Sequence, residues 1–155
     1  MAVSFRYTNV PTVHKLHKEN RMGDGRKANF NGSSFESVVE GVLKENGFQY
    51  EKQVKYTNLY GSNRCKIDFV VDNVYIECKF QAVSGSVDEK LPFCLHNLEQ
   101  FENGMVILGG DHWYTDRGIT IREWANKARE EGKFKSEVIL FEDFEKRLTT
   151  SRKII

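Results

Sequence analysis

Residues 66–79, KIDFVVDNVYIECK, contain two short apolar segments on either side of an Asp-Asn pair at 72–73, and each segment carries one acid. Asp and Asn tolerate the positive φ values that a two-residue hairpin turn requires. We therefore predict an antiparallel hairpin in which Asp68 lies opposite Glu77. The same register pairs Val71 with Val74, Val70 with Tyr75 and Phe69 with Ile76.

Side chains alternate along a strand, so this hairpin should have two different faces. The apolar face would consist of Ile67, Phe69, Val71, Val74, Ile76 and Cys78. The other face would carry Asp68, Glu77 and Lys79. Directly opposed residues have Cβ atoms about 5 Å apart, and like charges at that separation are destabilising. The two carboxylates therefore need a counter-charge.

A divalent cation is the natural counter-charge for this pair of acids. Mg²⁺ takes hard oxygen ligands, commonly one or two carboxylates together with waters and phosphate oxygens. Lys79 would project beside the ion, where it could hold or deprotonate an attacking water and neutralise charge growing on a phosphate. The alternative is an exposed face on which Lys79 forms a surface salt bridge with the acids.

The rest of the chain has the pattern of an α/β domain, with one mixed sheet between helices. Apolar residues at helical spacing indicate a helix over 34–46, and Ser33 with Glu36 fits a capping box at its start. The other expected elements are strands at 48–56, 105–108 and 137–141, a helix over 91–101 with Pro92 in its first turn, and helices at 119–131 and 142–148. We expect residues 33–155 to form a single domain.

The composition favours one soluble intracellular domain. The chain has 155 residues, of which 39% are hydrophobic and 29% charged, and this is enough to build one core. No apolar run approaches the roughly 20 residues needed to span a bilayer, and the start lacks the apolar core of a signal peptide. The three cysteines show no CxxC spacing, so we expect reduced thiols in the cytoplasm and neither zinc ligands nor disulfides.

Basic charge is concentrated at the start of the chain. Residues 1–32 contain six Lys or Arg and two acids, a balance of +4, which leaves −3 for the rest of a chain whose net charge is +1. We expect this segment to be an irregular arm able to lie along a phosphate backbone. A solvated tail that binds nothing is equally consistent with the charge alone.

Asp68 and the sequence Glu77-Cys78-Lys79 on the next strand, preceded by a helix that contains Glu36, resemble the PD-(D/E)XK nuclease superfamily. The resemblance spans about residues 33–108. It implies the restriction-endonuclease-like fold, a mixed β-sheet flanked by helices. It also implies magnesium-dependent hydrolysis of DNA phosphodiester bonds, with Mn²⁺ able to substitute.

Carried over by position, Asp68 and Glu77 would bind the metal together with Glu36 from the first helix, and Lys79 would assist the attacking water. The sequence departs from the family at Ile67, which stands where the nominal proline would be. This lowers the specificity of the motif more than it affects the chemistry.

Two further polar residues are candidates for the same site. Gln81 keeps the parity of Glu77 and Lys79, so it could contact the substrate or a water, although a polar residue at a strand end is also ordinary. Glu40, one turn after Glu36, is the reserve candidate for the helix acid, because a capping box would by itself account for Glu36.

These features predict a small magnesium-dependent DNA endonuclease. Restriction or homing cleavage is the favoured type, and structure-specific cutting in recombination or repair is the second. Symmetric cutting of two strands would favour a homodimer. Two alternatives are not enzymes: a DNA-binding module that cleaves nothing, and an interaction protein with a decayed site that neither binds nor cuts DNA.

Overall fold

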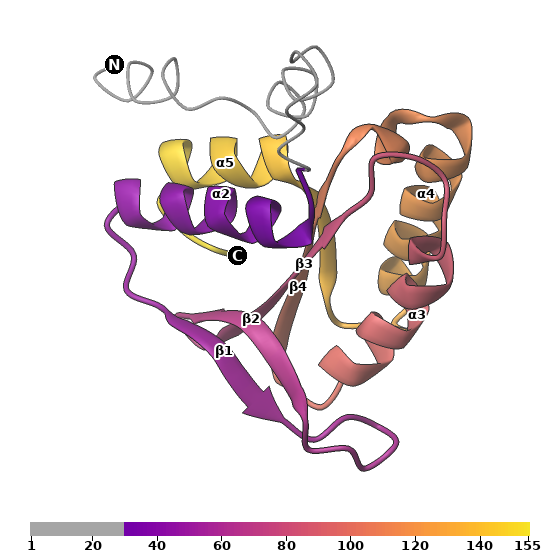
Figure 1. Ribbon diagram of the computed structural model, residues 1–155, viewed down its shortest axis with the longest axis horizontal. Helices are drawn as coiled ribbons and strands as arrows, with labels where there is room; N and C mark the ends of the chain where they lie inside the picture. The colour runs from indigo at the N-terminus through magenta and orange to yellow at the C-terminus, as the bar shows by residue number, and fades with distance from the viewer. Residues whose placement is uncertain (1–29) are drawn as a thin grey trace.

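A mixed sheet forms the centre of the domain (Figure 1). The computed structural model describes residues 30–155, so almost all of the predicted basic arm lies outside the described residues. The described strands are β1 (Glu51–Tyr56), β2 (Cys65–Val71), β3 (Val74–Phe80), β4 (Asn103–Gly109) and β5 (Glu137–Leu140), which lie in the sheet in chain order. Strands β1, β2 and β3 are antiparallel neighbours, whereas β3, β4 and β5 run parallel.

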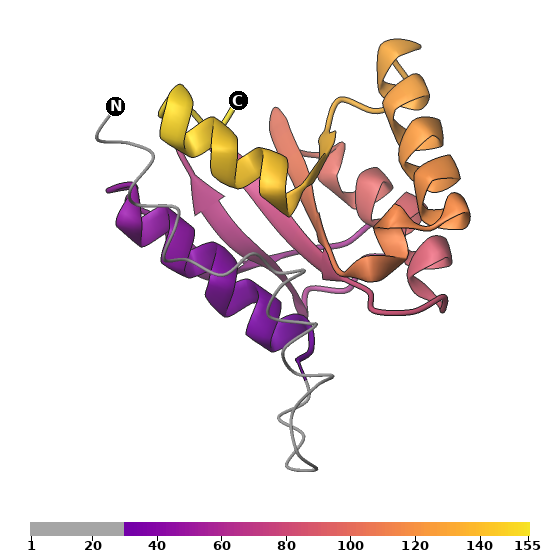
Figure 2. The same ribbon diagram turned by 90° about the horizontal axis from the view of Figure 1, so that it is seen from above.

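Helices cover both faces of this sheet (Figure 2). One face carries α2 (Gly32–Glu45) and α5 (Phe141–Thr150), and the other carries α3 (Val87–Leu98) and α4 (Asp116–Glu130), which follows the short 3₁₀ helix η2 (Asp111–Tyr114). Parallel neighbours need crossover connections, and α3 and α4 supply them. The predicted α/β class with a mixed sheet flanked by helices is therefore confirmed. No helix among residues 30–155 is both long and apolar enough to cross a membrane.

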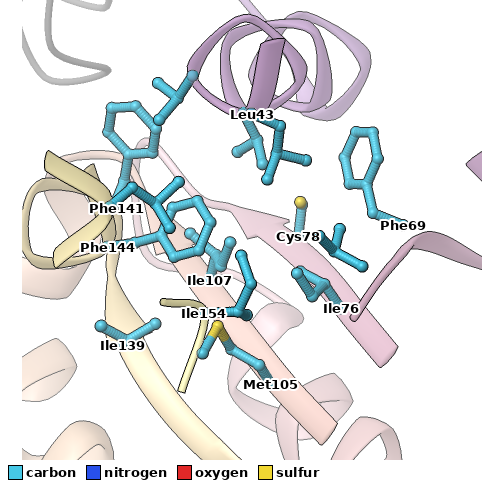
Figure 3. Close-up of a cluster of buried hydrophobic side chains, with 14 of the residues drawn as sticks. Leu43, Phe69, Ile76, Cys78, Met105, Ile107, Ile139, Phe141, Phe144 and Ile154 are labelled. Carbon is cyan, nitrogen blue, oxygen red and sulfur yellow. The ribbon is translucent and has the colours of Figure 1, made fainter. Parts of the chain in front are cut away.

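Each face of the sheet has its own apolar core. Figure 3 shows the core beneath α2 and α5, whose labelled members include Leu43, Phe69, Ile76, Cys78, Met105, Ile107, Phe141 and Phe144. The core beneath α3 and α4 includes Ile67, Leu91, Leu95, Leu98, Val106, Leu108 and Trp113. Strand β4 contributes alternate residues to both cores, as expected for a central strand that is buried on both faces.

The starts of two helices differ from the prediction. The N-cap of α2 is Asn31, whose Oδ1 accepts a hydrogen bond from the Ser34 N–H at 3.1 Å, so the predicted capping box between Ser33 and Glu36 is wrong. Helix α3 begins before residue 91, with acids in its first turn that favour a helix N-terminus, so Pro92 lies inside the helix and not in its first turn. Because Asn31 caps α2, the Glu36 carboxylate is free of a capping role.

Glu145 allows a test of how deeply a carboxyl group of α5 is buried. The side chain of Glu145 is buried, and burial, followed by the charges of Glu142 and Glu45, raises its pKa from 4.5 to about 7. The folded state therefore disfavours the ionised carboxyl. The resulting loss of stability grows as pH rises from about 4.5 to 7, and it remains constant at higher pH. Glu145→Gln should raise the melting temperature at pH 8 by about 2–4 °C, which corresponds to about 1 kcal/mol in a domain of this size.

The same substitution should change the melting temperature little at pH 4.5, where the carboxyl is protonated in the folded state. Glu123→Gln, at an exposed position of α4, is the matched control and should have no such pH dependence. A Glu145→Gln variant that melts lower than the wild type at pH 8 would contradict this account.

Candidate active site

The hairpin of β2 and β3 opens at its two acids. The predicted turn is confirmed, because Asp72 and Asn73 have φ values of 50° and 62°. The predicted pairs Val71 with Val74, Val70 with Tyr75 and Phe69 with Ile76 are all present. The predicted fourth pair, Asp68 with Glu77, is absent from the ladder, although both strands continue. Beyond this point β2 stays paired with β1, and β3 stays paired with β4.

A side-chain hydrogen bond marks the point where the strands separate. The Cys78 N–H donates to Asp68 Oδ2 at 2.8 Å, so a backbone donor of β3 is satisfied by a side chain of β2. Asp68 and Glu77 are both buried, each 8% exposed. A regular ladder would hold two such carboxylates directly opposite each other, which is unfavourable. The separation of the strands avoids that arrangement and keeps both acids in the interior.

The opening also changes the direction of Ile67. The prediction placed Ile67 on the same face as Phe69 and Cys78, and this is wrong: Ile67 packs in the core beneath α3 and α4, whereas Phe69 and Cys78 pack beneath α2 and α5. Strict alternation holds only for a regular strand backbone. The alternation of β2 breaks at Asp68, where the strand leaves β3.

Glu77 and Lys79 lie on one face of β3, with Lys79 Nζ 3.6 Å from Glu77 Oε2. Burial raises the pKa of Glu77 to about 8, and the charge of Asp68 contributes in the same direction. Burial lowers the pKa of Lys79, but the nearby Cys94, Glu77 and Asp68 outweigh this effect and hold that pKa above its usual value. Lys79 is therefore an ammonium group, and it cannot neutralise both carboxylates.

Helix α2 adds a third carboxylate. Burial raises the pKa of Glu36 to about 7, with further contributions from the charge of Asp68 and from a hydrogen bond with it. Glu40, the reserve candidate, lies in ion pairs with Lys52 Nζ at 2.9 Å and Lys44 Nζ at 3.6 Å. The hydrogen bond from Lys52 lowers the pKa of Glu40. Glu36, and not Glu40, therefore interacts with Asp68.

Close packing against the end of β4 fixes the turn of α2 that carries Glu36. A Cβ atom on Gly109 would lie 2.5 Å from the ring of Phe35, so this approach requires glycine. The Phe35 ring also packs against Phe80 at the end of β3, with 5.9 Å between ring centroids. The residue before Glu36 is therefore anchored where β3 and β4 end.

Gln53 is a residue at this site that the sequence analysis missed. Its Nε2 donates to Glu36 Oε2 at 3.4 Å, and it lines a hollow of about 220 Å³ that also includes Glu36 and Phe69. Gln53 has a φ of 53° in the middle of β1, opposite the irregular position of β2. Residues other than glycine rarely adopt positive φ angles, and the cases that do occur are concentrated at functional sites. Gln53 could have been found by aligning β1 with β2 as antiparallel strands, because their register places Gln53 opposite Asp68.

Gln81 occupies a different environment from the three acids. Its side-chain Nε2 donates to the Val83 carbonyl at 2.5 Å within the loop that follows β3. Its backbone N–H donates to the Gly109 carbonyl at 2.9 Å, which holds this loop against β4. In the part of the chain that the structure describes, Gln81 forms no hydrogen bond with Asp68, Glu77 or Lys79.

The donor set fits magnesium by its chemistry. Residues 30–155 contain no group of three or more His, Cys, Asp or Glu side chains placed to hold a metal ion. Magnesium commonly takes one or two carboxylates and completes its shell with waters and phosphate oxygens, so two acids such as Asp68 and Glu77 would be enough to hold it. Burial first, and then the charge of Asp68, raise the pKa values of Glu36 and Glu77, and a divalent cation beside them would favour their ionised forms.

Comparison with known proteins identifies the family. A family model described as a PD-(D/E)XK nuclease superfamily domain matches residues 27–150. The chain therefore belongs to the PD-(D/E)XK nuclease superfamily. No curated protein gives a significant match.

Among solved structures, the chain is similar to the crystal structure of a protein of unknown function, AF1548, with 15% sequence identity and a TM-score of 0.44. The match covers 72% of this chain and 59% of that one, so the chain spans about three fifths of the length of that protein.

The backbone of Gln53 provides a test of the site's local geometry. A β-branched residue at a positive φ is strongly disfavoured, so Gln53→Val should lower stability by roughly 1–2 kcal/mol. Gln53→Gly fits the angle and should cost less, because glycine adopts positive φ freely. Thermal unfolding of both variants measures the difference.

The matched control is Glu51→Val, at an exposed β1 position that pairs regularly with Val70, where a β-branched residue is favoured. If Gln53→Val proves no less stable than Glu51→Val, the irregular backbone of β1 is not present in solution.

Proposed function

We propose that this chain hydrolyses phosphodiester bonds of DNA in a magnesium-dependent reaction. The observation that carries this proposal is the convergence of Glu36, Asp68 and Glu77 beside the Lys79 ammonium, where β2 leaves β3. A buried cluster with more carboxylates than cations is costly for a fold unless a ligand uses it. Because the chain belongs to a nuclease superfamily, we infer that this ligand is a divalent metal ion that acts on a nucleic-acid phosphate.

In this proposal Asp68 and Glu77 hold the metal ion, and Glu36 completes the negative site from the side of α2. Held there, Mg²⁺ or Mn²⁺ would supply charge to neutralise a phosphate oxygen and would lower the pKa of a water. The Cys78 N–H donates to Asp68 Oδ2 and so fixes the orientation of this carboxylate, whose Oδ1 would be available to the ion.

Lys79 and two glutamines have the remaining roles. The Lys79 ammonium, held beside Glu77, orients the attacking water and opposes the negative charge that grows on the phosphate. Gln53 orients the Glu36 carboxylate through its side-chain amide. Gln81, in the loop after β3, is proposed to contact the substrate.

Within this activity we favour endonucleolytic cleavage of the restriction or homing type, in an intracellular setting. A catalytic core of this size offers limited surface for reading bases. Two identical chains would place one site on each strand of a duplex with two-fold symmetry, so we propose a homodimer as the form that cuts both strands.

A cleavage assay tests the proposal. The purified chain is incubated with supercoiled plasmid, linear duplex, single strands and a four-way junction, in MgCl₂ or EDTA, and the ends are mapped. We expect cleavage of duplex DNA in MgCl₂ and none in EDTA. Asp68→Asn, Glu77→Gln and Lys79→Ala should each reduce the rate by about 100-fold or more.

Lys146→Ala, at an exposed position of α5, is the control and should cut at the wild-type rate. Cleavage that persists in Asp68→Asn and Glu77→Gln alike would contradict the assignment of the site. Binding of DNA without cleavage by the wild type in MgCl₂ would favour a non-catalytic DNA-binding module, and cleavage restricted to the junction would favour a recombination or repair nuclease.

A further inference from the structure

A second charged cluster, of opposite sign, lies on the hairpin of β1 and β2. Lys55 and Lys66 are direct partners in the antiparallel ladder, and Arg64 lies immediately before β2. All three side chains belong to exposed residues. Within residues 30–155, none of the three forms an ion pair with an acid.

The pairing of Lys55 with Lys66 is electrostatically unfavourable by itself. Residues opposite each other in an antiparallel ladder have Cβ atoms about 5 Å apart, and like charges there destabilise the sheet. Solvent weakens this repulsion at an exposed site, but no described acid offsets it. The arrangement therefore suits an anion that comes from outside the chain.

The three cations surround a single open hollow of about 590 Å³. Its lining residues are Lys55, Tyr56, Thr57, Asn63, Arg64 and Lys66. The lining contains no acid, and its neutral members carry hydroxyl or amide groups that can donate hydrogen bonds. A hollow of this size exceeds a single phosphate group and suits an extended polyanion with several phosphates.

The hollow lies on the strand that carries Asp68. Lys66 precedes Asp68 by two residues on β2. Burial and, after it, the charge of Glu77 raise the pKa of Tyr56, which also lines the hollow. A chain of phosphates in the hollow would therefore contact β2 two residues before Asp68.

The loop between β1 and β2 is attached to α3 and to the turn that follows it, which gives the cations a fixed support. The Leu59 N–H donates to Asn97 Oδ1 at 2.8 Å, and Gln100 Nε2 donates to the Thr57 carbonyl at 3.2 Å. The rings of Tyr60 and Phe93 are stacked with 5.3 Å between centroids. Binding an anion here would need little ordering of the loop, which favours affinity.

We propose that this hollow binds the sugar-phosphate backbone of the DNA substrate on one side of the scissile phosphate. Lys55, Lys66 and Arg64 contact phosphate oxygens, and Thr57 and Asn63 donate further hydrogen bonds. The identity of the polyanion rests on the proposed function. Contacts of this kind set affinity and register but carry no base sequence, so the hollow should act equally on all sequences.

Salt-dependent binding tests this inference without cleavage. Fluorescence anisotropy with a labelled DNA duplex is measured in EDTA over a series of NaCl concentrations. Each phosphate contact contributes about 0.9 to the slope of log K against log salt, so Lys55→Gln combined with Lys66→Gln should reduce the slope by about 2. Affinity at low salt should fall by about tenfold or more.

The control is Lys146→Gln combined with Lys153→Gln, which removes the same charge from exposed residues in and after α5. The control should keep the wild-type slope, because the change in net charge is the same and only the location differs. The Lys55→Gln and Lys66→Gln variant should melt at or above the wild-type temperature, since it loses a repulsive pair. If it melts lower, Arg64→Gln, which lies outside the strands, replaces it and should reduce the slope by about 1.

Two results would overturn the inference: a wild-type chain that does not bind the duplex, or a hollow variant that binds with wild-type slope and affinity. These results are distinguishable from failure of the proposed function. Cleavage by the wild type together with unchanged binding by the variant would support the nuclease activity and reject the hollow as a DNA-binding site. A reduced salt slope in the variant without any cleavage by the wild type would support the hollow as a DNA-binding site and reject the nuclease activity.

Discussion

The hydrogen bond from the Cys78 N–H to Asp68 Oδ2 stands at the division of the sheet on which the site depends. On one side of it β2 remains with β1, and on the other side β3 remains with β4 and β5. Where the two strands separate, side chains from α2 and from β3 can approach Asp68. Glu36 approaches Asp68 from α2, while Glu77 and Lys79 approach from β3. Without this separation, Asp68 and Glu77 would be an opposed pair in a continuous sheet, and α2 would cover a closed surface.

Glu137 shows how a carboxylate with a structural role is paired in this protein. Glu137 receives two hydrogen bonds from Arg147, each 2.7 Å long, and these bonds lower its pKa. Bidentate pairs of this kind satisfy both oxygens and balance the charge. At the candidate site Lys79 is the nearby ammonium, and the pKa values of Glu36 and Glu77 are raised. The contrast supports the proposed role of Asp68 and Glu77 as metal ligands.

The sequence was sufficient where local rules decide the structure. The Asp72-Asn73 turn and three cross-strand pairs follow from turn chemistry and alternation, and the mixed sheet follows from the order of the elements. It was insufficient where a contact between distant segments breaks a local rule. The direction of Ile67 depends on where β2 leaves β3, and the conformation of Gln53 depends on β1 lying opposite that point. The capping role expected for Glu36 was displaced by Asn31, two residues before the expected cap.

In the proposed function, Asp68 and Glu77 are held together for a divalent cation and not for the stability of the fold. The most direct measurement is the melting temperature of the wild type and of Glu77→Gln, in EDTA and in MgCl₂, by calorimetry. We expect Glu77→Gln to melt at or above the wild type in EDTA, because it removes a buried carboxyl whose ionised form is disfavoured by burial and by Asp68. We also expect Mg²⁺ to raise the melting temperature of the wild type and not of the variant, since a ligand stabilises the state that binds it. A variant that melts well below the wild type in EDTA, with no effect of Mg²⁺ on either protein, would show a structural salt bridge with Lys79 and contradict the account.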